Sequence, residues 1–244
     1  MTKNFTHEQL NKKPIVLIIV GENGMISEQP CPEGQSGTAT WECGYDGHWI
    51  DYPDLSACSK IDIKESIDEL NEENSQPSIV IEKLNAKIRD EKDLGAGDIA
   101  NIIDFLDMAN LVQNERLESA PDPSQYAKEY TSQSVKMFGD ILDRSESWFG
   151  LPTSNKNEQL SKLQINVENV TKSMLTFTKE DEQSFSNKNL QITIKRGIED
   201  NGQEVFTNEN GDEIQVIPSN GNAKSVGFYG YNNFDCIVDG KFDW

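Results

Sequence analysis

The residues best suited to chemistry are three cysteines that lie close together. The chain has 4 cysteines, and Cys31, Cys43 and Cys58 fall within one short segment rich in glycine, tryptophan and proline. Small extracellular domains are commonly crosslinked in segments of this kind. The cytosolic alternative is a zinc site, but the segment has no C-x-x-C pair and His48 is its only imidazole. The cysteines therefore favour an oxidising compartment.

The residues around Cys43 and His48 do not favour a catalytic role. A nucleophilic cysteine needs a base, and a catalytic histidine needs a carboxylate or a second histidine at a supporting spacing. Neither arrangement occurs in this segment. A stray thiol or an intermolecular bridge explains Cys43 better, and we interpret His48 as a surface or packing residue rather than a contact for a peptide partner.

The segment's two tryptophans, Trp41 and Trp49, have two possible roles. They could form a ligand-binding face, because aromatic anchors dominate interface energetics. The favoured interpretation is structural, with both rings covering a disulfide bond and forming a small core. The surrounding sequence is rich in turn residues and predicts two or three short strands. So small a module buries little apolar surface and must depend on crosslinks.

The rest of the chain shows no catalytic constellation or cofactor-binding loop. The acidic turns at 200–202 and 208–213 lack the alternating oxygen ligands of a calcium-binding loop and are interpreted as hairpin turns. We therefore expect that the protein is not an enzyme and that it has no cofactor and no metal site.

Composition restricts the possible partners. Asp and Glu total 42 against 22 Lys and Arg, which gives a formal net charge of −20. Such a surface is repelled by phosphate backbones and anionic lipids, so we expect neither nucleic-acid binding nor direct membrane contact. A hydrophobic fraction of 35% over 244 residues is low for one compact core and predicts a modular chain.

The longest aliphatic run, residues 15–20, is too short to span a bilayer. It is followed by the turn Gly21–Gly24 rather than by a small-residue cleavage site, so no convincing signal peptide or transmembrane segment is recognised.

The order of elements predicts an α+β, modular fold: a small disulfide-stapled β module, then a helical bundle, then an incomplete antiparallel β-sandwich. Apolar periodicity predicts helices over 61–71, 77–89, 96–118, 123–149 and 156–177. In the third helix Asp98, Asp104 and Asp107 lie largely outside the apolar stripe. Alternation after Asn187 predicts strands at 190–194, 205–206 and 214–217. The expected domains are 1–27 of unclear role, 28–60, 61–178 and 187–244.

Three strings carry a family resemblance. CPEGQSGTATWECGYDGHWIDYPDLSAC resembles the hormone-receptor (HormR) domain of latrophilin-like adhesion G-protein-coupled receptors. PSIVIEKLNAKIRD and GDIANIIDFLDMANLV are similar to the helical subdomain of the GAIN domain that follows it. GDEIQVIPSNGNAKSVGFYGYNN resembles the opening of the GAIN β-sandwich. The resemblance covers about residues 28–238.

The resemblance implies a disulfide pairing, because HormR has four cysteines in two bridges and its most N-terminal cysteine is missing here. Cys31 would then pair with Cys58 and leave Cys43 without a partner, while the state of Cys236 stays open. The family's proteolysis site, tethered agonist and seven membrane spans do not occur in the chain, so we expect a fragment of a longer receptor.

Two functions follow from these observations. The first is an extracellular, non-enzymatic segment of an adhesion receptor that binds a protein or peptide ligand and is anchored at the plasma membrane in the full-length receptor. Its sequons at Asn4 and Asn169 would then be candidate glycosylation sites. The alternative is a soluble acidic helical scaffold or adaptor with reduced cysteines and a basic partner.

Overall fold

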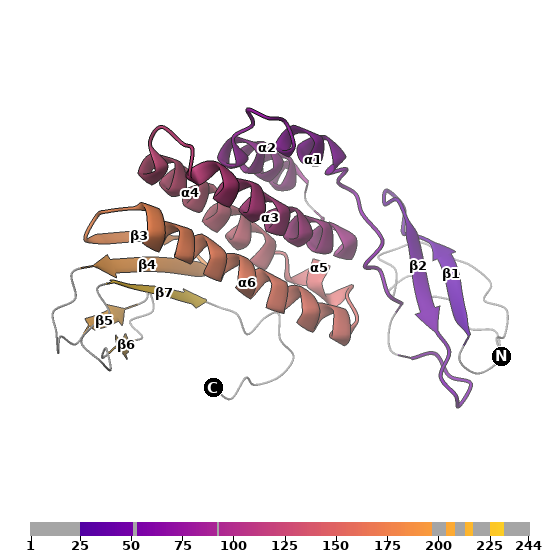
Figure 1. The fold of residues 1–244 in the computed structure, drawn as a ribbon. Helices are drawn as coiled ribbons and strands as arrows, with labels where there is room; N and C mark the ends of the chain where they lie inside the picture. Colours follow the sequence, from indigo (N-terminus) through magenta and orange to yellow (C-terminus); the bar gives the residue numbers. More distant parts are fainter. Residues whose placement is uncertain are drawn as a thin grey trace. The chain divides into compact units, whose positions relative to one another are not determined.

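A computed structural model describes most of the chain. The described residues are 25–50, 53–91, 93–196, 204–207, 213–216 and 225–231. They form six α-helices and seven β-strands, and the strands pair in small antiparallel sheets (Figure 1). The predicted α+β, modular fold class is confirmed.

The chain divides into two compact units, each assembled from segments that are distant in sequence. Unit 1 consists of Met1–Asp62, Glu91–Ile103 and Arg144–Leu160. Unit 2 consists of Ile63–Asp90, Asp104–Asp143 and Ser161–Trp244. The domains expected from the sequence are continuous segments, and their boundaries remain a prediction.

Unit 1 contains a small β-structure, which we call the disulfide module (residues 25–59). Its strands β1 (Ile26–Pro30) and β2 (Thr38–Glu42) pair antiparallel. Two isolated antiparallel bridges extend this sheet, Thr40 with Asp54 and Cys43 with Trp49. Ala39 and Trp41 of β2 are buried while Thr38 and Glu42 are exposed, so the module has one inner and one outer face.

The helical part of unit 1 comes from three elements: the first turns of α3 (Ala96–Leu117), α5 (Ser145–Phe149) and the start of α6 (Thr153–Phe177). Ile99, Ile102 and Ile103 of α3 are fully buried, as their helical spacing predicts. Trp148 of α5 is also fully buried. The helix ends of unit 1 therefore contribute fully buried apolar side chains.

Unit 2 is built on helices α1 (Lys64–Leu70), α2 (Pro77–Asp90) and α4 (Pro123–Leu142), with the later parts of α3 and α6. Pro123 suits the first turn of α4, and the Asp122 side chain caps that helix by accepting from the Gln125 N–H. The Arg116 guanidinium donates to the carbonyls of Glu72 and Ser75 just beyond α1. No helix within the described ranges is both long and apolar enough to cross a lipid bilayer.

The helix predicted over 123–149 is wrong in its extent, because α4 ends at Leu142 and α5 begins at Ser145. Arg144 leaves the helical region with φ −93° and ψ 52°. The cause visible in unit 2 is tertiary. Lys188 and Asn189 both donate to the Asp143 carboxylate, and Asn189 also donates to the Gly139 carbonyl near the end of α4.

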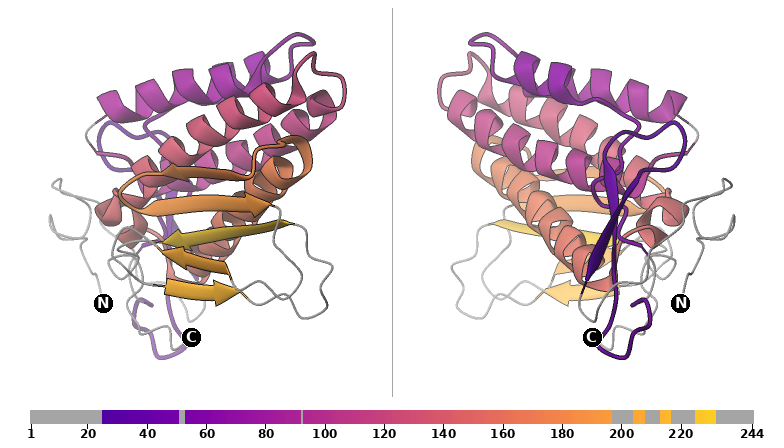
Figure 2. Two further views of the ribbon diagram at one scale, coloured as in Figure 1. Left: turned by 90° about the vertical axis from the view of Figure 1, so that its left-hand side faces the viewer. Right: turned by 90° about the vertical axis from the view of Figure 1, so that its right-hand side faces the viewer.

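The β-structure of unit 2 has a three-stranded sheet in the order β3-β4-β7, from β3 (Glu182–Ser186), β4 (Leu190–Arg196) and β7 (Ser225–Tyr231). A separate hairpin pairs β5 (Glu204–Thr207) with β6 (Glu213–Val216). Helices lie against one face of the three-stranded sheet (Figure 2). A Cβ on Gly227 of β7 would lie 2.6 Å from Thr171 Cγ2 of α6, so glycine permits this close packing.

Candidate functional site

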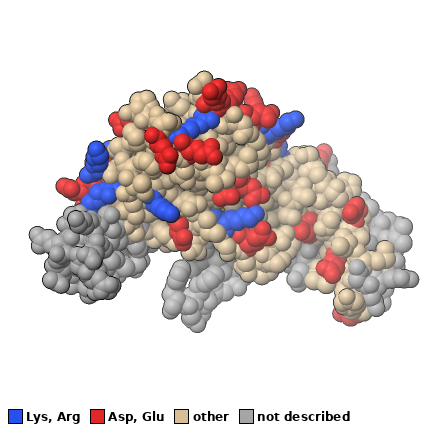
Figure 3. Space-filling model, viewed as in Figure 1, with Lys and Arg blue, Asp and Glu red and all other residues tan. Residues whose placement is uncertain are grey.

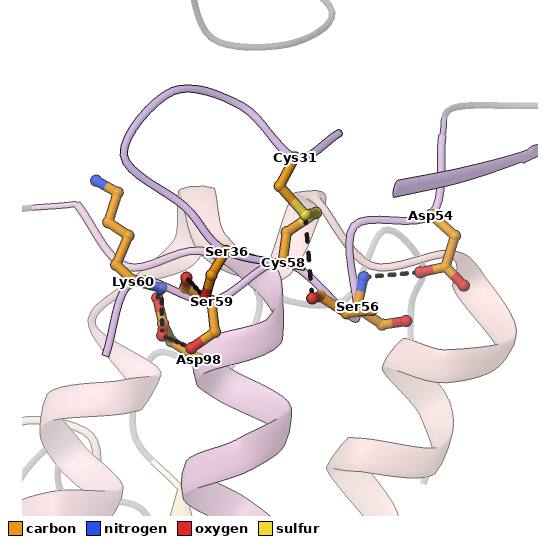
Figure 4. The surroundings of a disulfide bond; sticks show 9 residues. Cys31, Ser36, Asp54, Ser56, Cys58, Ser59, Lys60 and Asp98 are labelled. Carbon is orange, nitrogen blue, oxygen red and sulfur yellow. Dashed lines mark hydrogen bonds between the residues drawn. A yellow bond between two sulfur atoms is a disulfide. The ribbon is translucent and has the colours of Figure 1, made fainter. Parts of the chain in front are cut away.

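The disulfide module is closed by a bond between Cys31 and Cys58 (Figure 4). This is the pair that the family resemblance implies. Beside it, Ser36 and Ser59 exchange backbone hydrogen bonds of 2.8 and 3.0 Å. Gly37 has φ +114°, and a Cβ there would overlap the Ala57 carbonyl oxygen. The loop between β1 and β2 is therefore held to the C-terminal end of the module by a covalent bond, a backbone bridge and a position restricted to glycine.

The two tryptophans pack against each other on the inner side of the module. Their ring centroids are 5.0 Å apart, and the planes are tilted by 31°. Trp41 is buried and its Nε1–H donates to the Ile50 carbonyl at 2.9 Å, while Trp49 is half-buried. Paired aromatic rings with a satisfied indole N–H are well suited to form a small core.

Cys43 is a free thiol and is only 3% exposed. Its sulfur lies 3.7 Å from the Gly44 carbonyl oxygen, to which it can donate. A thiol buried to this extent is shielded from a second chain, so a packing role suits Cys43 better than an intermolecular bridge. His48 is exposed on the adjoining turn, and its backbone N–H donates to Asp46 Oδ1 at 3.0 Å.

A buried carboxylate, Asp98 in the first turn of α3, anchors the end of the module (Figure 4). Its Oδ1 accepts from the Ser59 hydroxyl at 2.5 Å and from the backbone N–H groups of Lys60 and Ile61 at 2.9 and 2.8 Å. Its Oδ2 accepts from the Gly95 N–H at 2.6 Å. A buried charge is tolerated only when it is well hydrogen-bonded, and the N-terminus of a helix favours an anion.

Sequence reasoning missed this anchor. It placed Asp98 outside the apolar stripe of its helix, and Asp98 is 1% exposed. The available signal was local: an aspartate in the first helical turn, directly after the sequence Gly95-Ala96-Gly97, suggests a capping interaction. Its partners at residues 59–61 lie more than thirty positions earlier in the chain and leave no periodic trace.

Two glycines allow α3 to approach the disulfide. The Gly97 N–H donates to the Cys58 carbonyl at 3.0 Å. A Cβ on Gly97 would lie 2.5 Å from that oxygen, and one on Gly95 would lie 2.8 Å from it. A larger residue at either position would push the helix away from the module.

Further contacts within unit 1 join the module to α5 and α6. The Leu55 N–H donates to the Gly150 carbonyl at 3.3 Å, at the end of α5. The Asn155 amide donates to Asp54 Oδ2 at 3.2 Å, in the first turn of α6. The module is thus attached by hydrogen bonds to the ends of three helices, in addition to its covalent connection along the chain.

The outer face of the module carries exposed apolar side chains. Ile26 of β1 lies opposite Glu42 of β2, and the Ile50 N–H donates to the Glu42 carbonyl from the other side. Ile26 is 62% exposed and Ile50 is 45% exposed. Tyr45 on the adjoining turn is 87% exposed. Exposed apolar groups gathered in one small module suggest a binding surface.

The Asp and Glu side chains of the module are not balanced by basic residues within it. Residues 25–59 contain no Lys or Arg. Their carboxylates are Glu28, Glu33, Glu42, Asp46, Asp51 and Asp54. Figure 3 shows acidic side chains on the face of the module that it draws. The surface is therefore repulsive to anions and attractive to basic groups.

The remaining predicted positions lie elsewhere. Asn169 is half-buried on α6, and Thr171 of its sequon is buried, with its hydroxyl donating to the Val167 carbonyl at 2.8 Å. Asn4 and Cys236 lie outside the described residues.

Taken together, the module offers a covalently closed, anchored platform with an apolar and acidic outer face. Such an arrangement can bind a partner and hold it in place. In the part of the chain that the structure describes, no three His, Cys, Asp or Glu side chains are grouped as a metal site. Neither the protein-family models nor the curated proteins give a match to this chain, so these contacts are the basis for inferring its function.

Proposed function

We propose that the chain is an extracellular, non-enzymatic segment of a latrophilin-like adhesion G-protein-coupled receptor. In this proposal residues 28–60 are a HormR-like module, 61–178 a GAIN-like helical subdomain and 187–244 part of a GAIN-like β subdomain. The segment binds a protein or peptide ligand and, in the intact receptor, couples that binding to transmembrane signalling. The observation that carries the proposal is the Cys31–Cys58 disulfide within a module anchored on helix ends.

The disulfide supports an extracellular location, because such bonds persist in oxidising compartments. Closing the loop between Cys31 and Cys58 contributes about 3 to 4 kcal/mol by the chain-entropy estimate. This is comparable to the whole stability that so small a module can reach. A module with this dependence is suited to the cell surface and poorly suited to a reducing cytosol.

The anchor at Asp98 supports a role in transmitting force or position. Ser59, Lys60 and Ile61 are held directly by a side chain of α3. Because these contacts replace a flexible linker, a ligand that pulls or rotates the module would also act on the first turns of α3. Preorganised attachment of this kind reduces the conformational freedom lost on binding.

Secretion of the chain from cultured animal cells behind an added signal peptide tests the extracellular part of the proposal. We expect secreted protein in which peptide mapping without reductant finds Cys31 linked to Cys58 and Cys43 as a thiol. Enzymatic deglycosylation then reports whether Asn4 and Asn169 carry glycans. Retention in the cell with Cys31 and Cys58 unlinked would contradict the proposal and favour the acidic adaptor.

Sequencing of full-length transcripts from the gene tests the receptor part. We expect reading frames that join this segment to a proteolysis site and seven membrane spans. If every transcript that contains these residues lacks membrane spans, the receptor assignment is wrong, even if the chain is secreted.

A further inference from the structure

We propose that the outer face of the disulfide module binds a polypeptide surface in which Lys or Arg side chains are flanked by apolar ones. We call the residues concerned the outer patch: Ile26, Glu28, Glu42 and Ile50. The inference rests on the proposed function, because it names the partner class for the protein-binding surface proposed there.

Strand geometry places the outer patch on one face. Residues directly opposite in an antiparallel pair share a face, and so do residues two apart in one strand. Ile26 is opposite Glu42, and Glu28 is two residues further along β1. Ile50 is on the same face, because its Cγ1 lies 3.3 Å from the position that a Cβ of Gly44 would occupy, two residues beyond Glu42. Three neighbouring segments thus present the row Ile26, Glu42, Ile50.

This row is not needed for the core of the module. Ala39, Trp41 and Cys43 point to the opposite face and are each less than 5% exposed. Ile26 and Ile50, by contrast, are 62% and 45% exposed. Burying their exposed apolar area against a partner would therefore favour a complex.

Charge decides which partner fits. Glu42 lies between the two isoleucines, and Glu28 is next to the row. Since residues 25–59 contain no Lys or Arg, no cation of the module neutralises these carboxylates. An acidic partner would be repelled, and a neutral apolar one would leave Glu42 desolvated without a counter-charge. A basic residue flanked by apolar side chains satisfies both the carboxylate and the isoleucines.

Methyl NMR on the whole chain tests this proposal. The probe is a short synthetic amphipathic helix of Leu and Lys, added to protein labelled at the isoleucine methyl groups. We expect the signals of Ile26 and Ile50 to shift on titration. Ile79 of α2 and Ile165 of α6 are internal controls, because they are 42% and 52% exposed and outside the patch. Equal shifts at all four isoleucines would overturn the proposal.

Two control peptides separate the charge from the apolar contribution. Replacing every Lys by Glu should abolish binding, and replacing every Leu by Ser should weaken it by about tenfold or more. Equal binding of either control would overturn the proposal, since only one half of the proposed chemistry would then be needed.

Charge reversal locates the site. Glu42→Lys should raise the Kd for the Leu/Lys helix by about tenfold or more. Glu33→Lys is the matched control, because it makes the same change at an exposed residue of the same module, in the turn after Cys31 rather than in the patch. An equal loss of affinity in both variants would show that only the net charge of the module matters. It would contradict a binding site at the outer patch.

The outcomes of these experiments are independent of those that test the receptor assignment. Peptide binding is measured on purified protein with its disulfide intact, whereas secretion and transcript sequencing do not involve the patch. Failure of the peptide experiment removes the partner class and leaves the receptor assignment standing, and failure of the transcript test does the reverse.

Discussion

Among the described residues of the disulfide module, the buried apolar side chains include Ala39, Trp41, Cys43 and Cys58, all of them from short segments. In unit 2 the helices bury full rows of large residues, among them Leu84 and Ile88 of α2 and Tyr130 and Phe138 of α4. The bundle therefore depends on the hydrophobic effect, which grows with the buried area. The module buries too little apolar area to be stabilised in this way. It is held instead by one covalent bond and by hydrogen bonds to helix ends.

The two regions are therefore vulnerable to different substitutions. A region that is stabilised by a large buried apolar area loses stability gradually as methyl groups are removed. A region held by a few specific bonds loses most of its stability when one of them is removed.

The largest effect is expected from Cys58→Ser. Loss of the bond to Cys31 removes about 3 to 4 kcal/mol, which should unfold the module and leave unit 2 helical. Amide hydrogen exchange followed by mass spectrometry reports the two regions separately. Cys43→Ser is the control, because Cys43 is a free thiol, and it should cost about 1 kcal/mol for a buried hydroxyl. Equal loss of module protection in both variants would show that the pairing is wrong.

Asp98→Ala should destabilise the attachment of the module by about 2 to 3 kcal/mol, because it removes the acceptor of the part-buried N–H groups of Lys60 and Ile61 and of the buried Gly95 N–H. In this variant the amide exchange rates of Lys60 and Ile61 should rise more than those of the amides at the end of α4. Asp104→Ala is the matched control on the same helix, because Asp104 is exposed and pairs only with Lys162 at 2.9 Å among the contacts described. A loss no larger than that control would contradict the anchor.

Tyr130→Phe tests whether polar contacts matter in the bundle as they do in the module. The Tyr130 hydroxyl donates to Asn110 Oδ1 at 2.8 Å, and Asn110 donates to Asn166 of α6. Burial raises the pKa of Tyr130 well above its usual value, so the hydroxyl stays protonated as a donor. We expect a loss of about 1 to 2 kcal/mol in chemical denaturation. An unchanged denaturant midpoint would mean that this hydrogen bond adds nothing to the stability that apolar packing gives the bundle.

The smallest effect is expected from Arg89→Ala. Its guanidinium pairs with Asp140 at 2.7 Å across α2 and α4, but the Arg89 side chain is 54% exposed. Exposed ion pairs contribute little, so we expect less than about 0.5 kcal/mol and a further reduction at high salt. Thermal unfolding at two salt concentrations measures this. A large loss would show that unit 2, like the module, depends on individual polar bonds.

Much of the secondary structure could be predicted from local pattern. The apolar repeat predicted α3 within one residue at its C-terminus, and alternation at 190–194 predicted β4. Strands β5 and β6 lie at or beside the predicted segments 205–206 and 214–217. Strand β3 was not predicted, because four of its five residues are polar and it becomes a strand by pairing with β4.

Less of the candidate site could be predicted. The cysteine cluster and the tryptophans were visible in the sequence, whereas the pairing of Cys31 with Cys58 came from the family resemblance. The outer patch was not predicted, because the exposure of Ile26 and Ile50 depends on which residues oppose them in the sheet. A one-residue change in the pairing of β1 with β2 would turn Ile26 to the other face.

Local sequence pattern is enough to derive the acidic charge, most of the helical and extended segments and the position of the crosslinked module. These properties depend on composition and on spacings of a few residues. Contacts in the folded chain set three further features: Asp98 holds the end of the module, α4 stops at Leu142, and Ile26, Glu42 and Ile50 form one row. Each of these depends on partners distant in the chain, and the free energy of such contacts is not recorded in local periodicity.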